Sequence, residues 1–357
     1  MKHLIALLSL ALLLTGCDVG APASRQMDNY LTRLGRVLEQ PVSHFDSRHL
    51  SHYRMPERRE RVQTVAEQRL SLLDLVVESR HCHALQQRIS ERNSSLGRLM
   101  PASHRLAHEG QLLQALDECL LVIADDPRRS ELKTQLEDIG AAKRASLPAV
   151  FWNALNASSE FEYYLRFADQ PLPPDPSISD TLALQALAEL SSIGQALPEQ
   201  LPPSREVLDP LFQALQRSSR SGQLIHSLAR LNHTLNQAST MLESPRAARL
   251  CPLGQPTPQS RILFNVFVTY YAGEIQPLLA QAQRLGQPWQ QQLTHLREVP
   301  EIPPATAAYL QRLSGHEQAL WESFQASVQR HNQAWLQVLE RCQLQPGQPG
   351  WEAARNE

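Results

Sequence analysis

Two groups of histidines in this sequence have residue types and spacings that could bind a metal ion. In the first, His104 and His108 stand four residues apart and Glu109 follows directly. On a helix this spacing places both imidazole rings on one face, as a zinc site requires. The general-base glutamate of a zinc protease would directly follow the first histidine, where this chain has Arg105, and no third ligand is marked. We therefore favour a solvated helix face.

The second group is His81-Cys82-His83, in which the cysteine is also a candidate for a disulfide. A cysteine with a bridging partner in an exported protein is more often half of a disulfide than a metal ligand. Three further histidines, His44, His49 and His52, fall in a segment without helical periodicity and are interpreted as a solvated loop. We expect no metal and no other cofactor.

The first seventeen residues read as an export signal. Lys2 and His3 form a short basic start, residues 4–14 are apolar with one serine, and Leu14-Thr15-Gly16-Cys17 follows. The apolar run has about half of the ~20 residues that a membrane-spanning helix needs. Residues 1–16 are therefore predicted to be a signal peptide that is removed.

The Leu14-to-Cys17 quartet resembles the lipobox of bacterial lipoproteins. The resemblance implies that Cys17 receives a diacylglyceryl group and becomes the acylated first residue of the mature protein. Since each buried methylene contributes about 0.8 kcal/mol, two or more acyl chains anchor a protein firmly. Asp18 resembles the signal that retains lipoproteins at the inner membrane, although this rule varies between bacteria and leaves the outer membrane open. Residues 17–24 are expected to be a lipidated tether, which keeps the body near the bilayer and facing the periplasm.

Composition indicates an ordinary globular chain. Of its 357 residues, 42% are hydrophobic and 20% charged, and the formal net charge of -2 lacks the basic footprint of nucleic-acid binding. Nucleic acid is therefore excluded as a partner. Abundant Leu, Ala, Gln, Arg and Glu, with only 14 glycines, favour an all-α fold, expected as a multi-helix bundle in two packed halves.

Beyond Cys17 there are four cysteines, an even number in a chain expected in an oxidising compartment. Three pairings are possible, and we prefer Cys82 with Cys119 and Cys251 with Cys342, because each pair then lies within one half of the chain. In a hairpin of two helices, the expected helix lengths place Cys82 and Cys119 at heights that differ by about 9 Å, at 1.5 Å per residue. This pairing therefore requires that the two helices be shifted along each other.

Apolar residues at helical spacing predict helices over 27–38 and 62–77, and stripes at 224–235 and 321–339 that face a common core. Weaker patterns predict helices through Cys82 to about Arg92, from a cap at Ser103 to Ile123, and over 128–144, 147–157, 159–168, 180–195 and 207–216.

Prolines between 170 and 178 mark the boundary between an N-terminal half, 25–169, and a C-terminal half, 179–342. The apolar run 262–271 is expected to be a buried helix or a strand. Residues 343–357, rich in Pro and Gly, are expected to be a disordered tail.

The segment 90–103 concentrates polar groups between two cysteines and is a candidate site. With the lipobox, Phe151-Trp152 and the stretch 158–161, it resembles a family of uncharacterised proteobacterial envelope lipoproteins, for which no activity is known. We favour a structural turn here, with Asn93 and Ser94 bonding helix ends, Gly97 at positive φ and Ser103 as a cap. The alternative is a binding site whose residues are Glu91, Arg92, Asn93, Ser94, Ser95 and Arg98.

The sequence lacks a nucleophile elbow, a phosphate-binding glycine loop and a Cys-x-x-Cys pair. We therefore predict a lipid-anchored envelope protein that is not an enzyme and has a binding or scaffolding role with an unidentified envelope protein as partner. One alternative is capture of a small molecule or lipid around the proline boundary, with 262–271 lining the cavity. The other is an envelope hydrolase, which requires a histidine bonded to a serine or carboxylate in a cleft.

Overall fold

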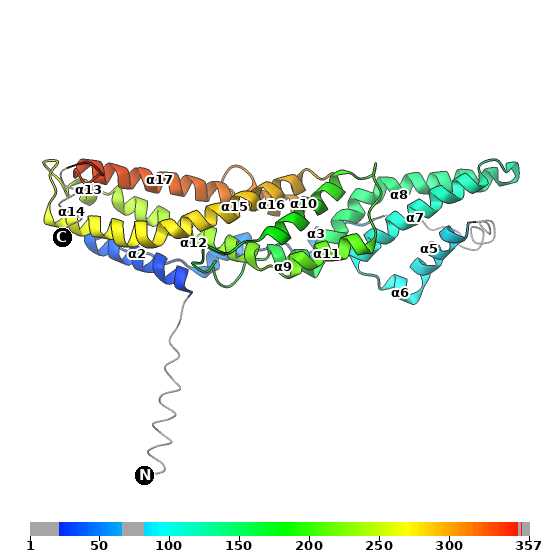
Figure 1. The fold of residues 1–357 in the computed structure, drawn as a ribbon, viewed down its shortest axis with the longest axis horizontal. Coiled ribbons are helices and arrows are strands. Elements are labelled where there is room, and N and C mark those ends of the chain that lie inside the picture. Colours follow the sequence, from blue (N-terminus) through cyan, green and yellow to red (C-terminus); the bar gives the residue numbers. More distant parts are fainter. Residues whose placement is uncertain (1–20, 66–81, 349–350, 352–357) are drawn as a thin grey trace, which may run out of the picture.

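The computed structural model describes residues 21–65, 82–348 and 351, and this part of the chain forms an elongated bundle of helices without a β-strand (Figure 1). The predicted all-α fold is confirmed. The helices of the described residues, including the 3₁₀ helices η1 and η2 and the π-helix η3, are α2 (Pro22–Leu38), η1 (Ser47–Tyr53), α3 (Arg58–Arg61), α5 (His83–Asn93), α6 (Ser95–Arg98), α7 (Ala102–Ile123), η2 (Pro127–Arg129), α8 (Ser130–Asn156), α9 (Ser159–Leu165), α10 (Thr181–Gln195), α11 (Arg205–Gln216), α12 (Arg220–Leu242), α13 (Pro245–Ala248), α14 (Pro258–Val266), η3 (Phe267–Ile275), α15 (Gln276–Arg297), α16 (Pro304–Ser314) and α17 (Leu320–Arg341).

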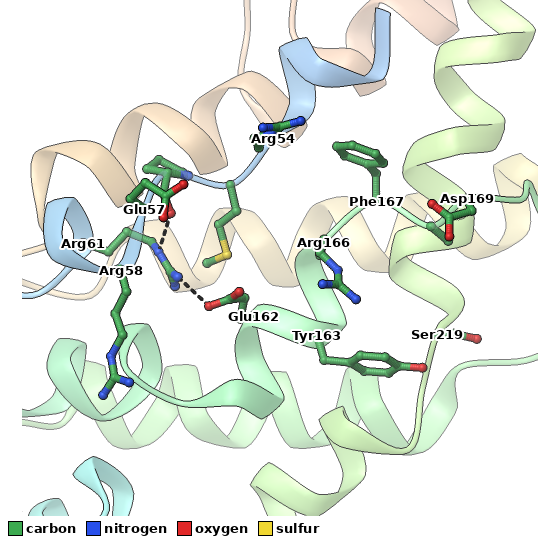
Figure 2. Close-up of a pocket in the computed structure, with 13 residues that line it drawn as sticks. Arg54, Glu57, Arg58, Arg61, Glu162, Tyr163, Arg166, Phe167, Asp169 and Ser219 are labelled. Atoms are coloured by element: carbon green, nitrogen blue, oxygen red, sulfur yellow. Dashed lines mark hydrogen bonds and ion pairs between the residues drawn. The ribbon is translucent and has the colours of Figure 1, made fainter. Parts of the chain in front are cut away.

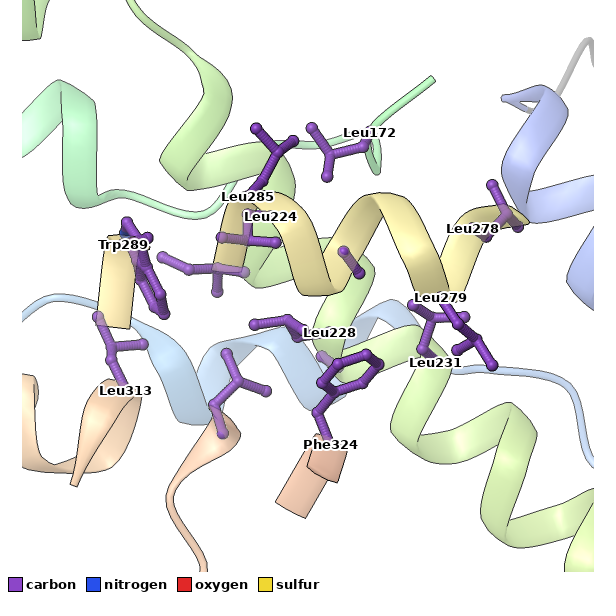
Figure 3. Close-up of a cluster of buried hydrophobic side chains, with 14 of the residues drawn as sticks. Leu172, Leu224, Leu228, Leu231, Leu278, Leu279, Leu285, Trp289, Leu313 and Phe324 are labelled. Carbon is purple, nitrogen blue, oxygen red and sulfur yellow. The ribbon is translucent and has the colours of Figure 1, made fainter. Parts of the chain in front are cut away.

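The main hydrophobic core runs along most of the bundle. The leucine stripe of α12, Leu224, Leu228, Leu231 and Leu235, is at most 2% exposed. Figure 3 shows part of this stripe against α15, which contributes Trp289, and against α17. Because the leucines recur every three or four residues, they lie on one face of α12, and this face is buried against α15 and α17. The core contains residues from before and after the 170–178 segment, so the two predicted halves share it.

A smaller hydrophobic cluster fills the projecting end of the molecule, where α5, α7 and α8 pack together (Figure 1). Cys82 and Cys119 are bonded within it, and their Cα atoms lie 5.1 Å apart. The mismatch expected from equal hairpin arms does not arise, because Cys82 is the residue directly before α5 and the short α6 separates α5 from α7. The second predicted bridge, Cys251–Cys342, is also present, so both pairings are confirmed.

Helix α8 joins the two clusters and corrects the prediction of two helices, 128–144 and 147–157. It is continuous, although Pro148 lies inside it and removes one backbone donor. Its first turns bury Leu132 in the smaller cluster, and its last turns bury Phe151 and Trp152, both 0% exposed, in the main core. Burial of these large side chains outweighs the local cost of the proline.

The structure is ordered further toward both termini than expected at the residues that it describes, 22–24, Leu344 and Trp351. Helix α2 begins at Pro22, and Ala23 and Ser24 are buried, so the predicted tether is shortened by three residues. At the other end Leu344 is 1% exposed and Trp351 packs edge-on to Phe264, which corrects the disordered tail for these residues. Burial of an apolar side chain fixes the backbone in both places.

Several other local predictions need correction. Residues 62–65 are not helical, and the rest of the 62–77 stripe lies outside the described residues. Ser103 does not cap α7, because the residue before that helix is Pro101. The 262–271 run is helical, and its residues Phe264 and Tyr271 are buried. Ile262 is 52% exposed, so one side of this helical segment faces solvent. Within the described residues no helix has the length and apolar character needed to cross a membrane.

A fully buried polar cluster holds α2, α12 and α17 together around His331. Ser239 donates its hydroxyl to the carbonyl of Leu235 at 2.6 Å, and its oxygen lies 3.1 Å from Nδ1 of His331. On the other side of the ring, Nε2 lies 2.8 Å from the hydroxyl of Tyr30, which accepts from Nε1 of Trp335 at 3.0 Å. This pattern assigns the proton of a neutral ring to Nδ1. Burial, reinforced by the neighbouring Arg330, lowers the pKa of His331 to about 3.

We expect stability to fall with acidification because His331 stays neutral in the fold. Between pH 6.5 and pH 3 the unfolded chain binds a proton at this residue and the folded chain does not, so stability rises with pH across that window. The loss between pH 6.5 and pH 5 is about 2 kcal/mol from this group. His331→Gln retains hydrogen-bonding capacity without titrating and should flatten the curve in urea denaturation measured from pH 7 to pH 5. Exposed His316 supplies the control, His316→Gln, and equal slopes in both variants would contradict the assignment.

Candidate functional site

A cavity of about 660 Å³ opens between the segment that contains α3 and the end of α9 (Figure 2). One wall consists of residues 54–58 together with Arg61. The other consists of Glu162, Tyr163 and residues 166–169, and Ser219 completes the lining. The volume lies in the range of small-molecule sites, 300–1,000 Å³. The cavity adjoins the 170–178 segment, where the sequence placed the boundary between the halves.

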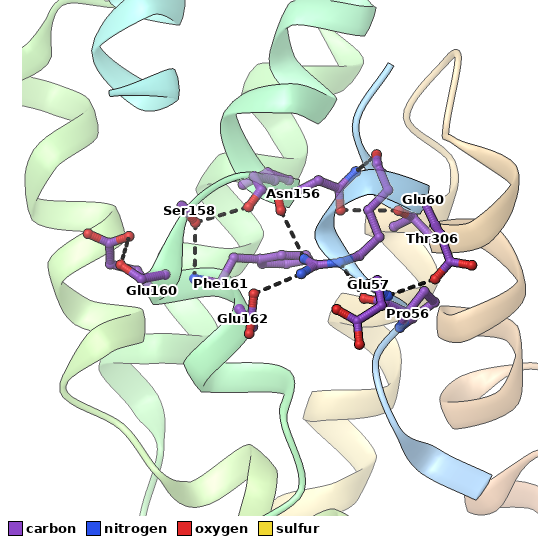
Figure 4. Close-up of polar contacts among 12 residues, drawn as sticks. Pro56, Glu57, Glu60, Asn156, Ser158, Glu160, Phe161, Glu162 and Thr306 are labelled. Atoms are coloured by element: carbon purple, nitrogen blue, oxygen red, sulfur yellow. Dashed lines mark hydrogen bonds and ion pairs between the residues drawn. The ribbon is translucent and has the colours of Figure 1, made fainter. Parts of the chain in front are cut away.

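The side chain of Arg61 is held in one position in the wall of this cavity by three hydrogen bonds. Only 1% exposed, it donates Nε to the carbonyl of Pro56 at 2.8 Å, Nη1 to the carbonyl of Asn156 at 2.9 Å and Nη2 to the carboxylate of Glu162 at 2.8 Å (Figure 4). Glu162 is about half-exposed, so this ion pair lies at the edge of the core. A guanidinium presents donors in several directions, which lets one side chain join α3 to the end of α8 and to Glu162 in the middle of α9.

Two asparagines of α8 bind the segment after α3. Asn153 accepts from the amide of Gln63 and donates to its carbonyl, both at 2.8 Å. Asn156 donates to the carbonyl of Arg61 at 3.0 Å and accepts from the hydroxyl of Thr306 at 3.1 Å (Figure 4). These side chains replace the backbone partners that a helix would supply, so the non-helical residues that follow Arg61 are held over the end of α8.

Three arginines around the cavity have unused donors. Arg54, Arg58 and Arg166 are exposed, and their side chains make no hydrogen bond or ion pair with the described part of the chain. Figure 2 shows Arg54 and Arg58 on one wall and Arg166 on the other. With Arg61, the lining has four arginines against three carboxylates, those of Glu57, Glu162 and Asp169. Such guanidinium groups bind carboxylates and phosphates by paired, charge-assisted hydrogen bonds.

A second open cavity, of about 590 Å³, lies between the start of α10 and the end of α11. Asp180 at its edge accepts hydrogen bonds from Tyr164 at 2.9 Å and from Ser218 at 2.5 Å. Burial raises the pKa of Asp180, and burial also raises that of Tyr164. Of its two arginines, Arg220 donates to Gln223 at 2.7 Å, so this cavity has fewer free guanidinium groups than the arginine-lined one.

The structure places the candidate residues of segment 90–103 in a compact turn. Glu91 pairs with Arg88 at 2.8 Å, and Arg92 donates to the carbonyl of Gly97 at 3.0 Å. Asn93 donates to the carbonyl of Ile89 at 2.9 Å. Four of the six candidates are thereby bonded locally, the fourth being Ser94, whose oxygen accepts from the amide of Gly97. The side chains of Ser95 and Arg98 are exposed and have no partner in the described residues, and the binding role stays a prediction.

Gly97 is required in this turn for a reason other than the expected positive φ. A Cβ on this residue would lie 2.1 Å from the carbonyl oxygen of Glu91, so only glycine allows the two backbone segments to approach.

In the part of the chain that the structure describes, His104 and His108 do not converge on one site. His104 lies 3.1 Å from Asp209, while Nε2 of His108 lies 3.0 Å from the carbonyl of Arg88, so the two rings have different partners. The expected solvated helix face is wrong, because His108 and Glu109 are buried and Glu109 pairs with Lys143. His49 lies near Phe45 and His233 beside a smaller surface cavity. Over residues 21–65, 82–348 and 351, no three His, Cys, Asp or Glu side chains are grouped as a metal site. His81 lies outside the described residues.

The contact between Ser239 and His331 does not have the arrangement of a nucleophile and its base. Both residues are 0% exposed, and the serine proton is donated to the carbonyl of Leu235 rather than to the ring. A serine nucleophile must instead present its oxygen to substrate and its proton to the histidine. The 262–271 run contributes no residue to the arginine-lined cavity, and neither does segment 90–103.

Sequence reasoning missed the arginine-lined cavity. The available signal was the density of arginine between Arg54 and Arg61 in a segment with few apolar residues. This density indicates a cavity only together with Arg166 and Glu162, about a hundred residues further along the chain. No periodicity of the sequence relates the two segments.

The chain matches the sequence model of one protein family over residues 27–346, from α2 to just beyond α17. The description of that family is "Protein of unknown function (DUF3080)". This agrees with the predicted resemblance to an uncharacterised family, while the expected lipidation and proteobacterial source stay predictions. No curated protein and no solved structure matches the chain.

Proposed function

The chain belongs to the DUF3080 family of proteins of unknown function, and we propose that it is a lipid-anchored protein of the proteobacterial cell envelope that faces the periplasm and binds a ligand without catalysis. The arginine-lined cavity is the observation on which the binding role rests. It combines a ligand-sized volume, a fixed wall at Arg61 and three free guanidinium groups.

The leader and the start of the fold support the anchor. Helix α2 begins at Pro22, five residues after Cys17. Five residues span at most about 18 Å, so an acylated Cys17 would keep the helical body next to the bilayer. Both disulfides support export, because such bonds persist in oxidising compartments such as the periplasm.

Binding is favoured over hydrolysis by the chemistry of the cavity. Its lining carries arginines, carboxylates, Tyr163 and Ser219, and no histidine. Arginine stays protonated at physiological pH and cannot act as a general base, whereas it is well suited to hold an anion. The geometry of the cavity therefore favours binding of a small molecule beside the 170–178 segment over a scaffolding role without a ligand.

The anchor is tested by the substitution Cys17→Ser in bacterial cells that express the full chain. We expect the unchanged protein to sediment with membranes and to enter the detergent-rich phase in a phase-separation assay. Cys17→Ser should remain in the aqueous phase or retain its leader, since the diacylglyceryl group is attached through a thioether bond, which needs the cysteine sulfur. Asp18→Asn is the matched control and should stay membrane-bound. An aqueous wild-type protein would refute the anchor.

A further inference from the structure

We propose that the arginine-lined cavity binds a phosphate ester, with Arg54, Arg58 and Arg166 holding the phosphoryl oxygens. This inference rests on the proposed binding function and specifies its ligand. The three guanidinium groups have no partner in the described residues, and they lie on both walls of one cavity. Figure 2 shows the three guanidinium groups well apart, with Arg58 directed away from Arg54, so these long side chains must turn toward the cavity to meet on a single anion.

The number of donors favours phosphate over carboxylate. A carboxylate has two oxygens and can be satisfied by one guanidinium fork, whereas a phosphate monoester has three terminal oxygens and close to two negative charges. Arg61 is already committed to Glu162 at 2.8 Å and to two carbonyls. The cavity therefore retains three free guanidinium groups for one incoming group, which suits the larger charge and oxygen count of a phosphoryl group.

The rest of the cavity can hold the organic part of an ester. Met55 is buried, and Phe167 is partly buried against the main core, so an apolar surface lies beside the arginines. Tyr163 and Ser219 add hydroxyl groups to the lining. Since a phosphoryl group alone occupies a small part of about 660 Å³, the remaining volume accommodates an attached polar or apolar group.

The chain segment that forms one wall of the cavity continues to a contact with the start of α2, the helix that follows the proposed anchor. Asp169 of the lining is three residues before Leu172, and Leu172 packs with Ala23 and Met27 of α2 around a small internal void. A phosphate ester could therefore reach the cavity as a soluble metabolite or as a phospholipid headgroup. The two sources present the same chemistry to the arginines and are separated by experiment.

The test is isothermal titration calorimetry on the acylated full-length protein in a neutral detergent. Glycerol 3-phosphate is expected to bind, and glycerol is not. Arg54→Gln, Arg58→Gln and Arg166→Gln should each weaken binding about tenfold or more, since a charge-assisted hydrogen bond is worth about 1.5–3 kcal/mol and 1.4 kcal/mol is tenfold. Exposed Arg59 is adjacent in sequence but absent from the lining, so Arg59→Gln is the matched control and should change affinity less than twofold.

Phosphatidic acid dispersed in the same detergent distinguishes the two sources. Tighter binding than that of glycerol 3-phosphate identifies a lipid headgroup, and equal binding identifies a soluble ester. The proposal is overturned if neither probe binds, if Arg166→Gln binds as the wild type does, or if acetate binds as tightly as glycerol 3-phosphate. Membrane partition of the same arginine variants is measured in parallel. Retained anchoring without phosphate binding refutes this inference alone, whereas loss of anchoring in the wild type refutes the proposed function.

Discussion

Replacing Arg61 with alanine is expected to lower the free energy of unfolding by about 3 kcal/mol or more, because several buried groups lose their partner together. The carbonyls of Pro56 and Asn156 each accept from Arg61 at 2.9 Å or less. Without the guanidinium the carbonyl of Asn156 remains in the protein interior, where an unsatisfied acceptor is costly, and that of Pro56 remains part-buried. Glu162 contributes less, since it is about half-exposed and water can solvate its charge.

Urea denaturation at neutral pH measures this effect, and two variants define its origin. Arg61→Lys keeps the charge, but its three donors share one nitrogen and cannot span the three acceptors that Nε, Nη1 and Nη2 reach, so we expect an intermediate loss. Arg59→Ala removes a neighbouring exposed arginine and should change stability by less than about 0.5 kcal/mol. If Arg61→Ala and Arg59→Ala had equal stability, the buried network would not be the element that fixes this wall of the cavity.

Removing the Cys251–Cys342 disulfide should have the second large effect on stability. The bond links the residue after α17 to the segment after α13 and closes 91 residues. On the chain-entropy account, a loop of this length is worth about 4 to 5 kcal/mol, as an upper value. Both cysteines are buried at the edge of the main core, so the serines of a double variant would also be desolvated.

The contrast with Cys82–Cys119 makes this prediction specific. That bond closes 37 residues within the smaller cluster at the projecting end, far along the bundle from the other bridge (Figure 1). We expect Cys251→Ser/Cys342→Ser to increase hydrogen exchange across α2, α12 and α17, and Cys82→Ser/Cys119→Ser to increase it mainly in α5 and the adjoining part of α7. Equal exchange patterns in the two double variants would contradict the division into two hydrophobic clusters.

The sequence predicted best those elements whose burial follows from local spacing. The faces of 27–38 and 224–235 were recognised because apolar residues every three or four positions must share one side of a helix. Pairing of the cysteines within each half was also confirmed. Pro148 misled the prediction of α8, because local propensity does not include the burial of Phe151 and Trp152 on the main core.

The candidate site could not be predicted in the same way. Arg54 lies between η1 and α3, Arg58 begins the four-residue helix α3, and Arg166 follows the short helix α9. What brings them together is the set of bonds from Arg61 and Asn153 to backbone groups about a hundred residues away. Such bonds have no sequence period. Segment 90–103 was instead selected for its local density of polar residues, most of which bond within the turn.

Mass spectrometry of the protein extracted from membranes tests the central proposal most directly. The account predicts that the mature chain starts at Cys17 and that its N-terminal peptide carries the added mass of a diacylglyceryl group and an amide-linked acyl chain. A chain that retains Met1 through Gly16, or one whose Cys17 carries a free thiol, would contradict the anchored role.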